Sequence, residues 1–164
     1  MFLLISPELQ DALREQYAHE VYNSHLYLYI ANFLKGKGLD NIAKHFEGQW
    51  AEEQEHSQII YKLLTDLGVV FEMPQIEGCS FDFPTFKSLT EKYLSREYET
   101  TESLNEIKLL AMSEESPNPV VEERIREMIL KQQHEYEEAT SMDDKAQLLS
   151  EWVYVVLWDA SLGE

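Results

Sequence analysis

Along most of the chain, hydrophobic and polar residues alternate at steps of three and four, the spacing of one face of an α-helix. The first such segment begins at Ser6-Pro7, a capping residue followed by a proline, and ends at Gly36-Lys37-Gly38. It predicts a helix with an inward row of Leu9, Leu13, Gln16, Glu20, Ser24, Tyr27, Ala31 and Leu34.

Three further long segments have the same spacing. They run from about Asp40 to Leu67, from near Pro84 to near Met112, and onward from Asn118-Pro119. The second inward row is Ile42, Phe46, Gln49, Glu53, His56, Ile60, Leu63 and Leu67. The third is Phe86, Thr90, Tyr93, Glu97, Thr101, Leu104, Lys108 and Ala111. The fourth is Val121, Ile125, Met128 or Ile129, Gln132, Glu135 or Tyr136, Ala139, Met142 and Ala146. A short apolar helix is predicted at about 151–162.

The connections predict the topology. Short links make the first and second helices antiparallel neighbours, and likewise the third and fourth. The stretch from Val69 to Phe83 has no helical period, and about 14 extended residues reach roughly 46 Å, enough to return along a 28-residue helix of roughly 42 Å. We therefore expect an all-α four-helix bundle with one long crossover between helices two and three. A single domain would span 1–164, with the bundle at about 6–149 and the short fifth helix at about 151–162.

The formal net charge of −18 over 164 residues limits the partners. Such a surface repels nucleic acid and anionic lipid and attracts cations, so we expect neither nucleic-acid nor membrane partners. Cys79 is the single cysteine, which excludes an internal disulfide. The stretch from Met1 to Pro7 has no basic region and no cleavage site, so no signal peptide is predicted and the cytoplasm is the expected location.

Each of the four inward rows has a glutamate near its middle: Glu20, Glu53, Glu97 and Glu135. His56 follows Glu53 by one turn on the same face. Burying four carboxylates together is very costly unless cations neutralise them. Carboxylate oxygens with one imidazole suit iron or manganese, and also zinc. A lone Glu-x-x-His is a weak signal in so acidic a chain, but glutamates at the same depth in three other rows indicate a site for two metal ions.

These motifs resemble those of bacterial non-haem ferritins, and the resemblance covers nearly the whole chain. The segments that carry it are Glu20 to Tyr27 (EVYNSHLY), Glu52 to His56 (EEQEH) and Leu104 to Ile107 (LNEI). The resemblance implies a ferritin-like four-helix bundle in which Glu20 and His56 bind one iron, Glu97 binds the second, and Glu53 bridges both. It also places Tyr27 beside the irons as an electron donor; the alternative is a core tyrosine whose hydroxyl hydrogen-bonds a ligand carboxylate.

The fourth helix leaves the ligand register open. The core row favours Gln132 and Glu135, whereas a local match to the family favours His134 and Glu137; we prefer the first pair. Many such ferritins have a third iron site, which Glu52 could serve. Its other acids correspond here to Lys131 and His134, and a lysine disfavours another cation. The third site is therefore in doubt, and His134 is interpreted as a surface residue.

Two further expectations follow from the resemblance. The haem-binding relatives have a methionine where this chain has Gln54, so no haem is expected. The apolar segment 152–162 resembles the short helix that ferritins pack around fourfold axes, which implies a homo-oligomeric shell of twenty-four subunits. The alternative is a segment folded back onto its own bundle.

The resulting hypothesis is an iron-storage protein with ferroxidase activity, which oxidises Fe(II) with dioxygen or peroxide and stores ferric mineral. The alternatives are another di-iron enzyme of peroxidase or oxygenase type, and a structural bundle that binds zinc or no metal. The chain lacks the paired cysteines that a rubrerythrin-like iron–sulfur module needs.

Overall fold

The computed structural model describes residues 5–164, which form five helices and no strand. The helices are α1 (Pro7–Gly36), α2 (Asp40–Asp66), α3 (Phe86–Met112), α4 (Pro119–Gln147) and α5 (Trp152–Leu162). The predicted all-α architecture is confirmed, and each helix begins and ends within about two residues of its predicted bounds, the usual uncertainty at helix ends. Residues 1–4, which belong to the segment examined for a signal peptide, lie outside the described residues.

Capping side chains start three of the helices, two of them at the predicted positions Ser6 and Asn118. The Ser6 hydroxyl accepts a hydrogen bond from the Leu9 amide at 3.2 Å, and the Asn118 carboxamide oxygen accepts one from the Val120 amide at 2.9 Å. Thr85 and Ser88 form a reciprocal capping box at the start of α3. These contacts satisfy amides that a helix leaves unpaired in its first turn.

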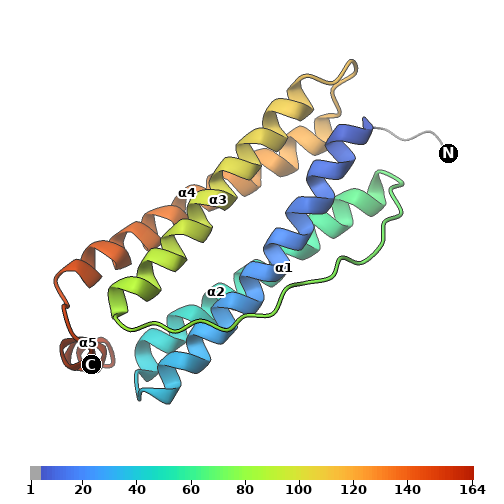
Figure 1. Ribbon diagram of the computed structural model, residues 1–164. Helices are drawn as coiled ribbons and strands as arrows, with labels where there is room; N and C mark the ends of the chain where they lie inside the picture. The colour runs from blue at the N-terminus through green and yellow to red at the C-terminus, as the bar shows by residue number, and fades with distance from the viewer. Residues whose placement is uncertain (1–4) are drawn as a thin grey trace.

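The helices form two antiparallel pairs, α1 with α2 and α3 with α4, and the two pairs lie side by side (Figure 1). The green crossover between α2 and α3 runs beside α1 along the length of the bundle (Figure 1), as predicted. Tyr29 attaches it to α1: the tyrosine hydroxyl donates to the Phe81 carbonyl at 2.7 Å and accepts from the Phe81 amide at 3.1 Å.

The apolar core is divided into two clusters. One contains residues such as Leu26, Phe46 and Tyr93, and the other contains residues such as Leu13 and Ile60. All predicted inward positions of α1 and α2 that lie within these helices are buried. A layer of polar side chains separates the clusters at mid-height, and this layer holds the candidate site.

The inward rows of α3 and α4 needed three corrections. Thr100 and Ile107 are buried in α3, whereas Thr101 is only partly buried and Lys108 is exposed, because the row steps by three residues from Glu97. The reason is that 3.6 residues per turn do not follow a strict four-then-three order.

In α4, Met142 is partly exposed and Asp143 takes the buried position. The Asp143 carboxylate accepts hydrogen bonds from the Thr90 hydroxyl at 2.8 Å and the Lys87 ammonium at 2.6 Å. A buried acid is tolerated here because both oxygens are paired.

The helix α5 lies crosswise at the end of the bundle (Figure 1). It contacts α2, where the Asp159 carboxylate accepts a hydrogen bond from the Ile42 amide at 2.7 Å. This carboxylate caps the start of α2, whose own N-cap residue, Leu39, has no side-chain acceptor. Among the helices in residues 5–164, none combines the length and apolar character needed to cross a membrane.

Candidate metal centre

One glutamate from each long helix, together with His56, meets in the polar layer between the two apolar clusters. Glu20, Glu53 and Glu97 are fully buried, and Glu135 and His56 are 3% and 5% exposed. Their ligand atoms form two groups, each with all atoms within 4.8 Å of one another: Glu20, Glu53 and His56, and Glu53, Glu97 and Glu135. Glu53 belongs to both groups, so it occupies the position that a bridging carboxylate requires.

The His56 ring lies between two of these carboxylates. Its Nδ1 is 3.6 Å from Glu53 Oε2, and its Nε2 is 3.7 Å from Glu135 Oε1. Glu53 and His56 share one face of α2 because they are three residues apart. Both separations are longer than a good hydrogen bond.

Most of the buried polar atoms without a partner are in this layer. Within residues 5–164, seven buried side-chain oxygen or nitrogen atoms have no hydrogen-bond partner. Six of them belong to the layer: Glu20 Oε2, both Glu53 oxygens, His56 Nδ1, Gln132 Oε1 and Glu135 Oε2. Buried polar atoms are normally paired, so a concentration of unpaired ones needs an explanation. Five oxygens and one imidazole nitrogen form a donor set that fits iron, manganese or zinc.

Electrostatics also favours cation binding at this point. Burial first, and then the neighbouring Glu53 carboxylate, raise the pKa of Glu20 well above its ordinary value. Burial likewise raises the pKa of Glu53, and together with the acids Glu52 and Glu97 it raises the pKa of Glu135 to about 10. Without a metal, these carboxyl groups therefore hold their protons more tightly than exposed ones do, because charged forms are costly in a buried site. Divalent cations would replace these protons.

Neighbouring side chains orient two of the carboxylates. The Tyr27 hydroxyl donates to Glu97 Oε1, and Gln132 Nε2 donates to Glu97 Oε2 at 2.6 Å. Both bonds lower the pKa of Glu97, although burial, the larger effect, keeps it raised. This contact matches the expected role of Tyr27 as a core tyrosine whose hydroxyl hydrogen-bonds a ligand carboxylate. It is also compatible with the other expected role, as an electron donor beside the irons.

Glu20 is oriented by residues that the sequence analysis did not assign to the site. Gln16 Nε2 donates to Glu20 Oε1 at 2.7 Å, and the Ser103 hydroxyl donates to Gln16 Oε1 at 2.6 Å. Gln16 could have been found, because it is a polar residue in the inward row one turn before Glu20. Ser103 gave no signal, since it lies outside the inward row of its helix.

The structure has the α4 register that buries Gln132 and Glu135. They are 1% and 3% exposed, whereas His134 and Glu137 are exposed. His134 Nε2 lies 3.3 Å from Glu138 Oε1 on the surface. The apolar row of Ile125 and Met128 sets this register, because it continues directly into Gln132.

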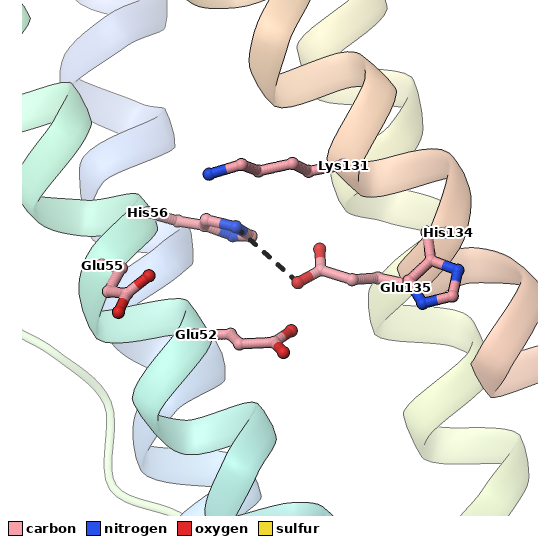
Figure 2. A pocket seen from close by; sticks show the side chains of 6 residues that line it. All are labelled: Glu52, Glu55, His56, Lys131, His134 and Glu135. Carbon is pink, nitrogen blue, oxygen red and sulfur yellow. Dashed lines mark ion pairs between the residues drawn. The ribbon is translucent and has the colours of Figure 1, made fainter.

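A pocket of about 290 Å³ opens beside the centre, between α2 and α4. Figure 2 shows its lining: Glu52, Glu55 and His56 from α2, and Lys131, His134 and Glu135 from α4. Glu52 is exposed and lies in this pocket rather than among the buried carboxylates. The side chain of Lys131 extends from α4 toward His56 (Figure 2), so a positive charge stands in the pocket beside the centre.

Comparison with known proteins agrees with this geometry. Residues 10–149 match the family described as the ferritin-like domain. The chain is 30% identical over 98 residues to the bacterial non-heme ferritin of Staphylococcus aureus, covering 60% of this chain and 59% of that protein. It is also 30% identical over 106 residues to ferritin BfrB of Mycolicibacterium smegmatis, covering 65% and 56%. These alignments span somewhat more than half of each relative's length.

Solved structures show the same fold. The open-pore ferritin of the archaeon Archaeoglobus fulgidus superposes with a TM-score of 0.88 at 22% identity, covering 98% of both chains. Chlorobium tepidum ferritin superposes with a TM-score of 0.83 at 21% identity, covering 89% of this chain and 88% of that chain. The family match covers nearly the whole of the four long helices and every residue of the carboxylate layer, and the chain therefore belongs to the ferritin-like family.

Proposed function

We propose that this protein stores iron: it oxidises Fe(II) at the buried carboxylate centre and retains the ferric product inside a shell made of its own copies. The observation that carries the proposal is the set of six unpartnered buried donor atoms from Glu20, Glu53, His56, Gln132 and Glu135. The names of the curated relatives, bacterial non-heme ferritin and ferritin BfrB, support the same function.

In the proposed reaction, iron is the substrate. One Fe(II) would bind to Glu20 and His56, the other to Glu97 and Glu135, and Glu53 would bridge them. Each Fe(II) gives one electron to dioxygen, so two Fe(II) and two protons convert one dioxygen to hydrogen peroxide and leave two Fe(III). Negative carboxylates favour the ferric state because it has the higher positive charge. The apolar clusters flank the layer on both sides.

Assembly into a shell is proposed from α5. Five apolar side chains of this helix are about half or more exposed on the single chain: Val153, Tyr154, Val156, Leu157 and Leu162. So many exposed apolar residues on one short helix are typical of a protein interface. Copies of the same helix around a symmetry axis would cover them.

We expect Leu157→Asp, at a side chain that is 67% exposed in the isolated subunit, to convert a very large particle into small species. A charge buried in an apolar interface without a partner is strongly unfavourable. Size-exclusion chromatography with light scattering measures the change, and Ser161→Asp on the same helix controls for the added charge, because Ser161 is exposed and already polar. A Leu157→Asp particle of wild-type size would contradict the role of α5.

From the position of Lys131 we expect each chain to bind two metal ions rather than three. Its ammonium lies in the pocket that Glu52 and Glu135 also line, where it competes with a further cation. We expect Mn²⁺ titration calorimetry to give two ions per wild-type chain and a third in Lys131→Glu. Lys131→Gln is the control, because it removes the charge without adding a ligand. Three ions in the wild type would contradict this prediction.

The experiment that tests the proposed function is aerobic addition of ferrous iron to the apoprotein, followed by iron analysis of the size-exclusion peak. We expect ferric absorbance to develop faster than in buffer, with hundreds of irons per particle. Rapid oxidation that stops near two irons per chain in a small particle would indicate a di-iron enzyme of peroxidase or oxygenase type. Oxidation at the buffer rate would indicate that the layer binds another metal or only shapes the bundle.

A further inference from the structure

Two tyrosines, Tyr27 and Tyr93, are completely buried next to the carboxylate layer. Their rings meet edge to face, with centroids 5.3 Å apart and an interplanar angle of 86°. Tyr27 contacts the centre directly, because its hydroxyl donates to Glu97. The proposed function makes no use of Tyr93, although its ring is in van der Waals range of Tyr27.

The Tyr93 hydroxyl points to a proton acceptor. It lies 3.2 Å from His45 Nε2, and within residues 5–164 this imidazole is its one hydrogen-bond partner. Burial lowers the pKa of His45, so the ring is neutral at physiological pH. With the ring proton on Nδ1, Nε2 accepts the hydrogen bond and can also accept the proton itself.

The position of His45 would stabilise the proton once it has moved. The negative charges of Glu138 and Glu52 both act to raise the pKa of His45, against the larger effect of burial. An imidazolium formed there would therefore have two negative groups nearby. His45 and Tyr93 are themselves edge to face, with centroids 5.8 Å apart, which keeps the donor and acceptor together.

We propose that Tyr93 and His45 form a second redox pair, which supplies one electron to the metal centre through Tyr27 and keeps the resulting radical away from the iron. The inference rests on the proposed ferroxidase function. The electron transfer requires an oxidant. The proposed ferroxidase reaction supplies one, because it reduces dioxygen to the peroxide level. A tyrosine gives up an electron readily only when its phenolic proton has an acceptor, and His45 is that acceptor.

The Tyr27 ring passes one electron to the oxidant, and its hydroxyl stays hydrogen-bonded to Glu97. Tyr93 then gives one electron to Tyr27, and its own phenolic proton moves to His45 Nε2, with which it is hydrogen-bonded. The net result is one electron delivered to the oxidant, one proton on His45, and a neutral radical on Tyr93.

The other seven tyrosines do not have this combination. All of them are at least partly exposed. Tyr98, for example, is 50% exposed and donates its hydroxyl hydrogen bond to a surface carboxylate, Glu102. Phe46 also contacts Tyr93, at 5.0 Å between centroids, but a phenylalanine ring has no phenolic proton to release. Buried apolar rings around Tyr93 would lengthen the lifetime of a radical by excluding solvent.

The test is freeze-quench electron paramagnetic resonance. Protein loaded anaerobically with two Fe(II) per chain is mixed with dioxygen or hydrogen peroxide and frozen at intervals from milliseconds to seconds. Wild-type protein should show a tyrosyl radical whose hyperfine splitting disappears in Tyr93→Phe, leaving only a shorter-lived signal from Tyr27. His45→Leu should lower the yield of the Tyr93 signal at least tenfold, and Tyr27→Phe should remove it. Tyr61→Phe, at an exposed tyrosine on α2, is the control and should retain the wild-type spectrum.

Several outcomes would overturn the inference. One is the absence of any tyrosyl radical in wild-type protein that oxidises its iron. The others are a radical spectrum and decay that are unchanged in Tyr93→Phe, or a yield of the Tyr93 radical that is unchanged in His45→Leu. Failure of the proposed function looks different, because the iron itself would then be oxidised no faster than in buffer. Circular dichroism and the Mn²⁺-dependent melting shift of each variant show that its bundle and centre are intact.

Discussion

Replacement of Glu53 by alanine should abolish fast oxidation of Fe(II). Glu53 is the one residue that belongs to both groups of candidate ligands, so its loss removes a ligand from both iron positions at once. Loss of an outer residue that only orients a ligand typically lowers activity about 10–100-fold. Loss of the shared bridge should therefore lower the initial rate by more than about a hundredfold.

Stopped-flow absorbance of the ferric product measures this effect on the assembled particle. Glu137→Ala is the matched control: Glu137 is an acid on α4 that is exposed in the structure, so its replacement should leave the rate unchanged. A large loss of rate in Glu137→Ala would favour the other α4 register. An unchanged rate in Glu53→Ala would end the assignment of the centre, and loss of helical structure would count against it.

Binding of metal should raise the melting temperature of the wild-type protein, and this rise should depend on Glu53. In the metal-free wild type, both Glu53 oxygens are buried without a partner. Binding of Mn²⁺ at a concentration one hundred times its dissociation constant would stabilise the fold by about 2.7 kcal/mol per site. For a chain of this size, that corresponds to a rise of about 5 °C or more in melting temperature.

Glu53→Gln should change the melting temperature both without and with metal. The metal-free variant should melt at a higher temperature than the metal-free wild type. At neutral pH, folding forces Glu53 either to take up a proton or to bury a charge, a cost of about 1–4 kcal/mol that the neutral amide avoids. The same variant should lose most of the Mn²⁺-dependent rise. Melting followed by circular dichroism with and without Mn²⁺ measures both effects, and Glu137→Gln should behave like the wild type. A metal-free Glu53→Gln variant that is less stable, yet still responds fully to Mn²⁺, would contradict a metal-binding role for this residue.

The sequence alone predicted the helices, the crossover and the residues of the polar layer, for identifiable physical reasons. Ser6, Thr85 and Asn118 cap helices in the structure, and the first and last of these were recognised before prolines. Glu20, Glu53, His56, Glu97 and Glu135 were found because a carboxylate at an inward position conflicts with its apolar neighbours. Such conflicts are visible in sequence without knowledge of any contact.

Contacts between helices could not be predicted in the same way. Thr100 and Thr101 are chemically identical neighbours, so periodicity could not decide which one faces inward. The buried position of Asp143 depends on Lys87 and Thr90 of another helix, and the role of Ser103 depends on its contact with Gln16. Long-range pairings of this kind are set by how the helices pack against one another, which one helix's pattern does not contain.

The polar layer has a consequence for how this sequence can change. Because it separates the two apolar clusters, side chains at one end of the bundle do not pack against those at the other. Substitutions in the two ends should therefore affect stability independently, since additivity holds for residues without shared partners. Each end is free to evolve by its own sequence of neutral replacements. The residues of the end near α5 can change as the proposed subunit interface requires. The residues of the carboxylate layer stay the same, while the sequences of the two ends diverge at separate rates.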